Sequence, residues 1–153
     1  MVYARYIEKV FNLFAKPKNL PWTTKQLGDR GEELAARYLE KKGYKILVRQ
    51  WRARNGEIDL ICRHGEQLVF VEVKARSDET FNLARHAVTS SKERNVAQSG
   101  MEYLRKLGSP DLVFRFDIVE VNTEEPQYPQ FRHIERAFGL PVGSQYLPLS
   151  HEV

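Results

Sequence analysis

The stretch GEIDLICRHGEQLVFVEVKAR, residues 56–76, contains two β-forming runs on either side of a short turn. Gly65 and Glu66 fit the two central positions of a type II′ turn, because Gly takes the first position, where φ must be positive. A two-residue turn of this type joins antiparallel strands. The stretch therefore predicts a hairpin in which His64 faces Gln67.

Side chains alternate along each strand of this hairpin, so its two faces differ in character. Counting back from the turn places Asp59 opposite Glu72 and Glu57 opposite Lys74. These four charged residues share one face with Ile61, Leu68 and Phe70. The other face is wholly apolar and should be covered by helices; it carries Ile58, Leu60, Cys62, Val69, Val71 and Val73.

Two carboxylates directly opposite each other on a sheet destabilise it. A protein can keep such a pair, here Asp59 and Glu72, if the two share a proton or bind a cation. Oxygen ligands without His or Cys favour Mg²⁺ or Mn²⁺ over zinc. The alternative is a surface ladder in which Glu57 pairs with Lys74 beside a solvated Asp59. On the bare pattern the two interpretations are evenly matched.

Outside the hairpin, hydrophobic spacing predicts a mixed α/β layer structure. The expected elements are a helix over 24–42, strands over 44–53, 57–63 and 67–75, a loop over 76–88, a helix over 90–107, and strands over 112–121 and 131–134.

Capping signals mark the ends of the two helices. Thr23 with Gln26 and Ser90 with Glu93 each fit a capping box, in which two side chains satisfy helix N–H groups reciprocally. Gly43 fits the C-terminal stop of the first helix.

The buried face of the first helix has two unusual features. Gly28 and Gly31 both fall on it, and because glycine is unfavourable inside a helix, the pair predicts a close approach to the sheet. Glu32 lies at the edge of that face, an uncommon place for a carboxylate, whereas Glu33 points away. Val96, Gly100, Leu104 and Leu107 should form the buried side of the second helix.

Length and composition restrict the class of protein. A chain of 153 residues with 42% hydrophobic and 29% charged residues is typical of one globular domain. No apolar run reaches the roughly 18 residues that a membrane span needs. A single cysteine, Cys62, allows neither an internal disulfide nor a Cys-based zinc cage, and it suits a reducing cytoplasm.

The net charge of +4 is carried by the N-terminal part of the chain, because residues 32–153 are balanced. Such a total favours a polyanionic partner only weakly, and solubility explains it as well. Residues 1–22 form an expected amphipathic extension, followed by a domain over 23–140 and a C-terminal tail over 141–153. Packing of the extension on the domain or on a second copy of the chain, in a homodimer, is favoured over a membrane-surface helix or a disordered start.

Taken together, residues 56–61 and 70–76 resemble the PD-(D/E)XK nuclease signature. The match is closest to the YraN family of bacterial proteins, which are similar to archaeal Holliday-junction resolvases. Residues 28–32, 43–44, 115–117 and 131–138, with Lys92, agree with that family, so the resemblance covers about 25–140. The sequence departs from it in its N-terminal extension and at Gln50-Trp51, where the family more often has Asn after the Arg.

The resemblance implies an α/β fold with a restriction-endonuclease-like core, a mixed β-sheet flanked by helices. It also implies a metal site in which Asp59, Glu72 and the backbone carbonyl of Val73 bind Mg²⁺ or Mn²⁺. Glu32 would be a further ligand, directly or through water.

Two lysines complete the catalytic set that the resemblance implies. Lys74 would orient or deprotonate the attacking water or steady the transition-state charge, and Lys92 matches a family position in the first turn of the next helix. The implied reaction is metal-assisted hydrolysis of phosphodiester bonds in DNA, branched or otherwise structured.

A candidate nucleic-acid surface follows from residues 45–54, which hold several basic side chains and no acid. Arg49, Arg52 and Arg54 near Trp51 fit phosphate contacts combined with base stacking, and Arg76 lies beside the expected site. A solvated strand edge with a buried Trp51 is nearly as good an interpretation. A non-catalytic nucleic-acid-binding or adaptor module with the same fold, and a structural partner protein, are the rival function classes.

Overall fold

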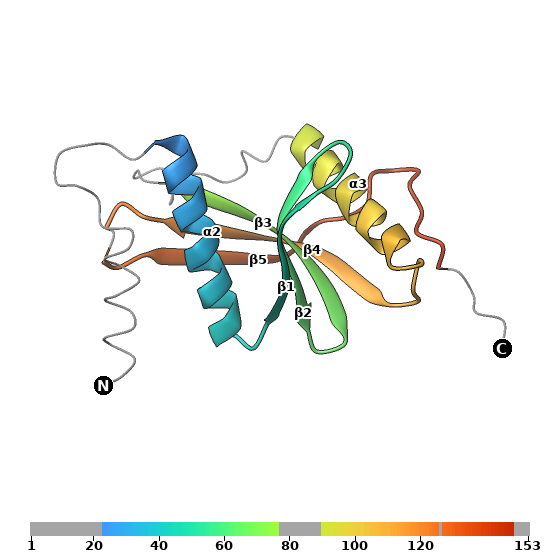
Figure 1. Cartoon of the computed structure of the whole chain (residues 1–153), viewed down its shortest axis with the longest axis horizontal. Helices are drawn as coiled ribbons and strands as arrows, with labels where there is room; N and C mark the ends of the chain where they lie inside the picture. Colours follow the sequence, from blue (N-terminus) through green and yellow to red (C-terminus); the bar gives the residue numbers. More distant parts are fainter. Residues whose placement is uncertain (1–22, 77–89, 126, 149–153) are drawn as a thin grey trace.

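The computed structural model describes residues 23–76, 90–125 and 127–148 (Figure 1). The expected N-terminal extension and almost all of the expected loop over 76–88 lie outside these ranges. The elements in chain order are α2 Thr24–Lys41, β1 Lys45–Arg52, β2 Glu57–His64, β3 Gln67–Arg76, α3 Ser90–Lys106, β4 Val113–Asn122 and β5 Gln130–Phe138.

The strands form one five-stranded mixed sheet in the order β1-β2-β3-β4-β5. The β3–β4 pair is parallel, and the other neighbours are antiparallel. The chain between β3 and β4 includes α3, as a parallel crossover requires. The fold is therefore α/β, and it is compatible with the restriction-endonuclease-like core that the sequence predicts.

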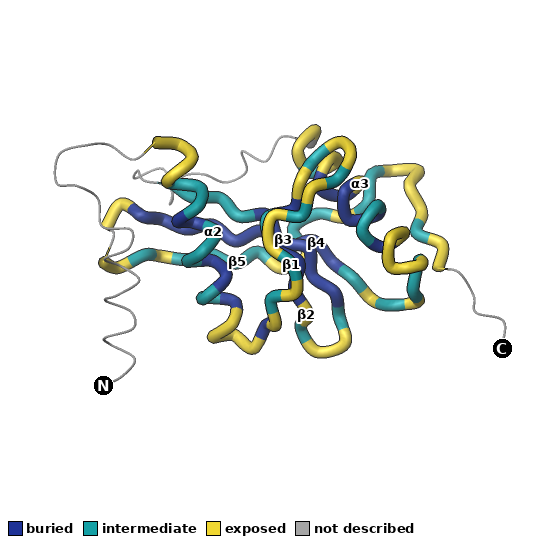
Figure 2. Tube along the Cα trace, viewed as in Figure 1, coloured by how far each residue is buried: buried dark blue, intermediate teal, exposed yellow. Residues whose placement is uncertain are grey.

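Each helix covers one face of the sheet, and each face has its own core. Ala35, Ala36 and Leu39 of α2 pack on Leu60 and Val71 of the hairpin, within a cluster that also holds Cys62 and Val69. A second cluster forms where Val96, Ala97, Met101 and Leu104 of α3 meet Ile61, Phe70 and Phe116. Buried positions accordingly concentrate in the middle of the sheet (Figure 2).

The capping signals of α2 are borne out. Thr23 Oγ1 accepts a hydrogen bond from the Gln26 N–H, and the Gln26 side chain accepts one from the Thr23 N–H. Gly43 follows the helix with φ of +88°, a conformation that glycine adopts at little cost. At α3, the side chain of Ser90 lies outside the described part, so its capping box stays a prediction.

Three sequence expectations are corrected by the structure. Ile58 packs in the α3-side cluster rather than beside Leu60, because the start of β2 lies against α3. Leu107 is 50% exposed, since α3 ends one residue before it. Strand β5 is longer than 131–134 and continues to Phe138; Glu135 and Arg136 are exposed, so the apolar pattern marks only its first half.

Gly31 provides the expected close approach to the sheet, and Gly28 does not. A Cβ on Gly31 would collide with the Cβ of Ala75 on β3, whereas a Cβ on Gly28 would meet no atom within 4 Å. Gly31→Ala should therefore lower the free energy of unfolding by about 1–3 kcal/mol through overpacking. Gly28→Ala should raise it by about 0.5–1 kcal/mol, because alanine favours the helix. Urea unfolding of both variants checks this, and effects of the same sign would contradict the packing.

A buried ion-pair network fastens β5 to β4. Arg115 Nε donates to Asp117 Oδ1 over 3.0 Å, as expected for residues two apart on one face of a strand. The NH2 group of the same guanidinium donates to the Tyr44 hydroxyl over 2.7 Å. Asp117 Oδ2 lies 2.8 Å from His133 Nε2, and Asp117 Oδ1 accepts the Arg136 N–H. The side chain of Asp117 is fully buried, so these hydrogen bonds and ion pairs replace the water contacts that its charge loses on folding.

The end of the described chain returns to the domain. Tyr146 packs beside the α3-side cluster, and its hydroxyl donates to the Pro110 carbonyl over 2.5 Å. Part of the segment expected as a C-terminal tail thus contacts the core. None of the helices in the described ranges is both long and apolar enough to cross a membrane.

Candidate active site

The two hairpin strands pair in the predicted register only as far as Leu60 opposite Val71. Beyond that point Asp59 does not face Glu72 in the ladder; instead, Asp59 Oδ2 accepts a hydrogen bond from the Val73 N–H over 2.7 Å. Glu57 pairs with Arg52 of β1 rather than facing Lys74 in the ladder. A side-chain carboxylate thus takes over one backbone N–H of β3 at the point where the strands separate.

Glu72 lies on β3 with its side chain only 3% exposed, and two lysines supply its counter-charge. The ammonium group of Lys92, from the start of α3, contacts Glu72 Oε1, and Lys74 Nζ lies 3.8 Å from the same oxygen. Burial opposes the charge on Lys92, but the hydrogen bond and charge of Glu72 outweigh it and raise the pKa of Lys92. Glu72, Lys74 and Lys92, three of the predicted site residues, therefore meet at Glu72 Oε1.

Lys74 is the more enclosed of the two lysines, with its side chain 13% exposed. Burial lowers the pKa of Lys74, and the positive charge of Lys92 lowers it further. A lysine whose charged form is disfavoured in this way is better suited to exchanging a proton near neutral pH than a solvated one.

Glu32 reaches the site from α2 and is held there by Gln50 of β1. Gln50 Nε2 donates to Glu32 Oε2 over 2.9 Å. Burial raises the pKa of Glu32, and this hydrogen bond only partly offsets it. Gln50 has φ of +49°, the left-handed region, which Asn tolerates better than Gln. The Asn that the family more often has after the Arg would suit this backbone.

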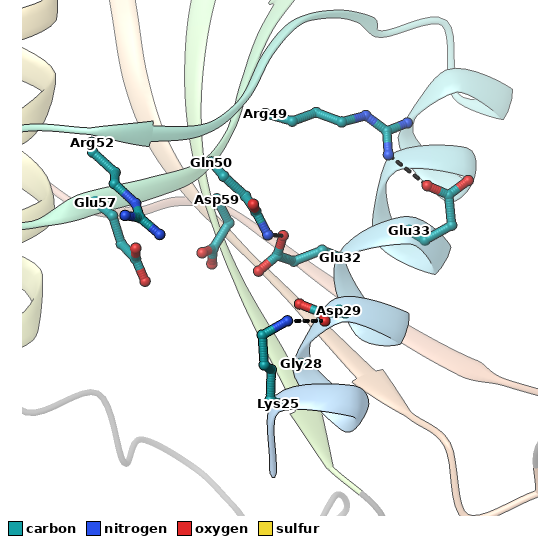
Figure 3. A pocket seen from close by; sticks show the side chains of 10 residues that line it. All are labelled: Lys25, Gly28, Asp29, Glu32, Glu33, Arg49, Gln50, Arg52, Glu57 and Asp59. Atoms are coloured by element: carbon teal, nitrogen blue, oxygen red, sulfur yellow. Dashed lines mark hydrogen bonds and ion pairs between the residues drawn. The ribbon is translucent and has the colours of Figure 1, made fainter. Parts of the chain in front are cut away.

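Glu32 and Asp59 line one pocket of about 630 Å³ between α2 and β1 (Figure 3). Figure 3 shows both carboxylates pointing into the same space, with the Gln50 amide between β1 and Glu32 and with Arg52 and Glu57 at the far side. Open on one side and lined mainly by charged groups, the pocket suits a polar ligand.

Glu33, which the sequence placed away from the buried face, also lines this pocket. Its carboxylate binds Arg37 Nε over 2.7 Å and Arg49 NH1 over 2.5 Å. Burial opposes its charge, but hydrogen bonds from both arginines hold the pKa of Glu33 below its ordinary value. Glu33 thus lies outside both hydrophobic clusters, as expected, but β1 passes close to that side of α2 and its Arg49 pairs with the carboxylate.

The environment of Asp59 disfavours its charged form. Burial is the largest cause that raises the pKa of Asp59 to about 8, and the charge of Glu72 is the next. Glu32 adds to the effect, while the Val73 N–H and Lys92 oppose it. With this pKa the Asp59 carboxyl is largely protonated near neutral pH in the metal-free protein, and a bound cation would favour its ionised form.

These donors match a hard divalent cation in chemistry, since all are oxygens and a cation would favour the ionised form of the carboxyl groups. In the part of the chain that the structure describes, however, no three His, Cys, Asp or Glu side chains form a group that could hold a metal ion. Lys92 instead occupies Glu72 Oε1. A cation bound by Asp59 and Glu72 would take over the role that Lys92 has in this arrangement.

The five candidate nucleic-acid contacts are not equally available. Arg52 and Arg54 are exposed, while Arg49 is exposed but engaged with Glu33. Trp51 is half-buried, packs edge-on against Tyr103 and has Lys106 Nζ 5.2 Å from its ring centre. Arg76 is half-buried at the end of β3, where its carbonyl accepts the Thr123 N–H.

Sequence reasoning missed Gln50 and the pairing of Glu33 with Arg49. Both are contacts between α2 and β1, elements separated by a turn, and no local periodicity encodes them. The only signal was the departure from the family pattern at Gln50, which coincides with the left-handed backbone.

Comparison with known proteins places the chain in a family. The model described as "Uncharacterised protein family UPF0102" matches residues 31–121. A UPF0102 protein of Geobacter sulfurreducens is 41% identical over 116 residues, 76% of this chain and 91% of the relative. The UPF0102 protein of Geobacter metallireducens is 44% identical over 76% of this chain and 94% of its own length. The one of Rhodococcus jostii is also 44% identical, over 73% of this chain and 95% of its own length. The chain belongs to the UPF0102 (YraN) family.

Proposed function

We propose that this protein is a metal-dependent endonuclease that hydrolyses phosphodiester bonds in DNA, with branched or otherwise structured DNA as the substrate class, in the cytoplasm. The observation that carries the proposal is the meeting of Asp59, Glu72 and Lys74 where β2 and β3 separate. Glu32 lies in the same pocket as Asp59, so the predicted set comes from α2 and two strands of one sheet.

Each residue has a role that its position supports. Asp59 and Glu72 would hold Mg²⁺ or Mn²⁺ with the carbonyl of Val73, and Glu32 would assist directly or through water. The ion supplies Lewis-acid charge and lowers the pKa of a bound water. Lys74, whose own pKa is lowered by burial, would position the water and take up its proton.

Lys92 contributes a second positive charge at this centre. Its ammonium contacts Glu72 Oε1, and its side chain is 54% exposed, so it can move toward solvent or toward a substrate phosphate. We assign Lys92 to charge compensation in the free protein and to phosphate contact in the complex.

Lys74→Ala should leave Mn²⁺ affinity within about twofold and reduce cleavage at least 10²-fold. An interaction made only in the transition state lowers the rate without weakening binding in the ground state. The fold should tolerate the change because Lys92 still pairs with Glu72. Calorimetric Mn²⁺ titration and single-turnover cleavage measure the two effects, with Lys41→Ala at the exposed end of α2 as the control. Unchanged cleavage by Lys74→Ala would refute its role.

One observation favours a second candidate, a non-catalytic nucleic-acid-binding or adaptor protein. Glu72 is already neutralised by Lys92, and the described residues form no group of three metal donors. An adaptor of this kind would bind DNA without Mg²⁺ or Mn²⁺. A divalent-ion affinity that Asp59→Asn abolishes would exclude it.

A further inference from the structure

A second pocket of about 520 Å³ lies between α3 and the tip of the β1–β2 hairpin. The hairpin contributes Arg54 and Asn55 to its lining, and α3 contributes Gln98 and Arg105. The same hairpin supplies Arg52 to the pocket that holds Asp59. The two pockets therefore flank one short hairpin.

The tip of this hairpin is held rigidly against α3. The Ala53 N–H donates to the Gly56 carbonyl over 2.8 Å and closes the turn. The Arg54 N–H donates to Glu102 Oε2 over 3.0 Å. A Cβ on Gly56 would lie 3.0 Å from Ser99 Oγ, a tight contact, so glycine suits this close approach. The pocket is thus formed before any ligand arrives.

The lining of the second pocket is suited to an anion. Arg54 and Arg105 are both exposed, and within the ranges the structure describes no acidic side chain forms an ion pair with either guanidinium. The acid in the pocket, Glu102, is engaged by the Arg54 N–H and by Lys106 Nζ at 3.7 Å. Two guanidiniums with the amides of Asn55 and Gln98 offer the planar donors that phosphate oxygens accept.

We infer that this second pocket binds a backbone phosphate of the DNA strand whose scissile bond lies at Asp59. The inference rests on the proposed function. It requires that the bound DNA strand extend from the scissile bond at Asp59 to the second pocket. Lys92 begins α3 beside Glu72, and Gln98 and Arg105 lie 6 and 13 residues further along the same helix. At 1.5 Å per residue the phosphate lies about 9–20 Å from the candidate centre, or roughly three to six nucleotides.

Salt-dependent DNA binding tests the inference. Arg105→Gln and Arg54→Gln should each weaken binding of a labelled duplex about 5- to 10-fold and reduce the slope of log K against log salt by about one. Lys41→Gln removes the same charge from the exposed last residue of α2, outside the candidate nucleic-acid surface over 45–54, and should change affinity less than twofold. Anisotropy titrations without divalent metal, between about 50 and 200 mM NaCl, give these values. Pocket variants indistinguishable from Lys41→Gln would overturn the inference.

The outcomes separate this inference from the proposed function. Cleavage by the wild-type protein with unchanged salt slopes in the pocket variants would overturn the inference alone. The predicted slopes without any cleavage would support the phosphate site and refute the nuclease. Absence of DNA binding by the wild-type protein would refute both. Because the two guanidiniums recognise phosphate oxygens, inorganic phosphate at equal ionic strength should displace DNA from the wild-type protein better than chloride, and Arg54→Gln and Arg105→Gln should each reduce this difference. A difference that survives unchanged in both variants would overturn the assignment to this pocket.

Discussion

Asp59→Asn should abolish Mn²⁺ binding while raising the melting temperature of the metal-free protein. Burial, and after it the charge of Glu72, raises the pKa of Asp59 to about 8, so this carboxyl must take up a proton on folding at neutral pH, which costs stability. Asn keeps an oxygen that can accept the Val73 N–H, so the local backbone is preserved, and it has no carboxylate to protonate. A gain of about 1 kcal/mol would raise Tm by roughly 2–4 °C. Groups kept at a cost to stability are typical of functional sites.

Calorimetry and thermal unfolding with and without Mn²⁺ measure both parts of this prediction. Saturating Mn²⁺ should raise the Tm of the wild-type protein, because a ligand that binds only the folded state stabilises it, and should leave Asp59→Asn unchanged. Asp29→Asn is a suitable control: it removes another carboxylate that lines the same pocket and pairs with exposed Lys25. Loss of stability in Asp59→Asn, or retained Mn²⁺ affinity, would argue for a purely structural carboxylate.

Asp117→Ala should have the largest effect on folding. It removes the acceptor of Arg115, His133 and the Arg136 N–H, and it leaves the Arg115 guanidinium, whose side chain is 7% exposed, without its main counter-charge. Breaking a buried pair in this way costs about 3–5 kcal/mol, which would lower Tm by roughly 10 °C. The exposed pair of Glu66 with Arg63 is the control, because Glu66→Ala should cost less than about 1 kcal/mol.

The same network should make stability depend on acid pH. Burial alone would raise the pKa of Asp117, but the hydrogen bonds from His133 and Arg115 outweigh it and hold that pKa below its ordinary value. Its contribution is therefore fully present above about pH 4, the range of an unfolded Asp, and is lost as pH falls through the lowered pKa. Stability measured from neutral pH downward should fall less steeply below pH about 4 in Asp117→Ala than in the wild-type protein. Parallel curves would show that Asp117 carries no such contribution.

Local patterns predicted the parts of the site that depend on local geometry. The turn at Gly65 set the register of β2 and β3, and helical periodicity placed Glu32 at the edge of the buried face of α2. Both rest on fixed repeats, two residues for a strand and 3.6 for a helix, so they can be read without knowing what packs against them.

Contacts between separate elements could not be predicted in this way. The β2–β3 ladder stops at Leu60 because the Asp59 carboxylate accepts the hydrogen bond of the Val73 N–H. This contact depends on the tertiary structure and not on local sequence. The left-handed Gln50 and the approach of Lys92 to Glu72 likewise depend on how β1 and α3 dock on the sheet. The resemblance supplied Lys92, which periodicity alone would have left as a solvated helix residue.

The most direct test of the metal-dependent nuclease is cleavage of a panel of duplex, single-stranded, flap and four-way DNA. Wild-type protein and the Asp59→Asn and Asp29→Asn variants, purified in parallel, are compared in Mn²⁺ and in EDTA. The account predicts cleavage of at least one structured DNA by wild type and Asp29→Asn in Mn²⁺, none in EDTA, and none by Asp59→Asn. Cleavage that persists in EDTA or in Asp59→Asn, or no cleavage of any DNA by wild-type protein in Mn²⁺, would contradict it.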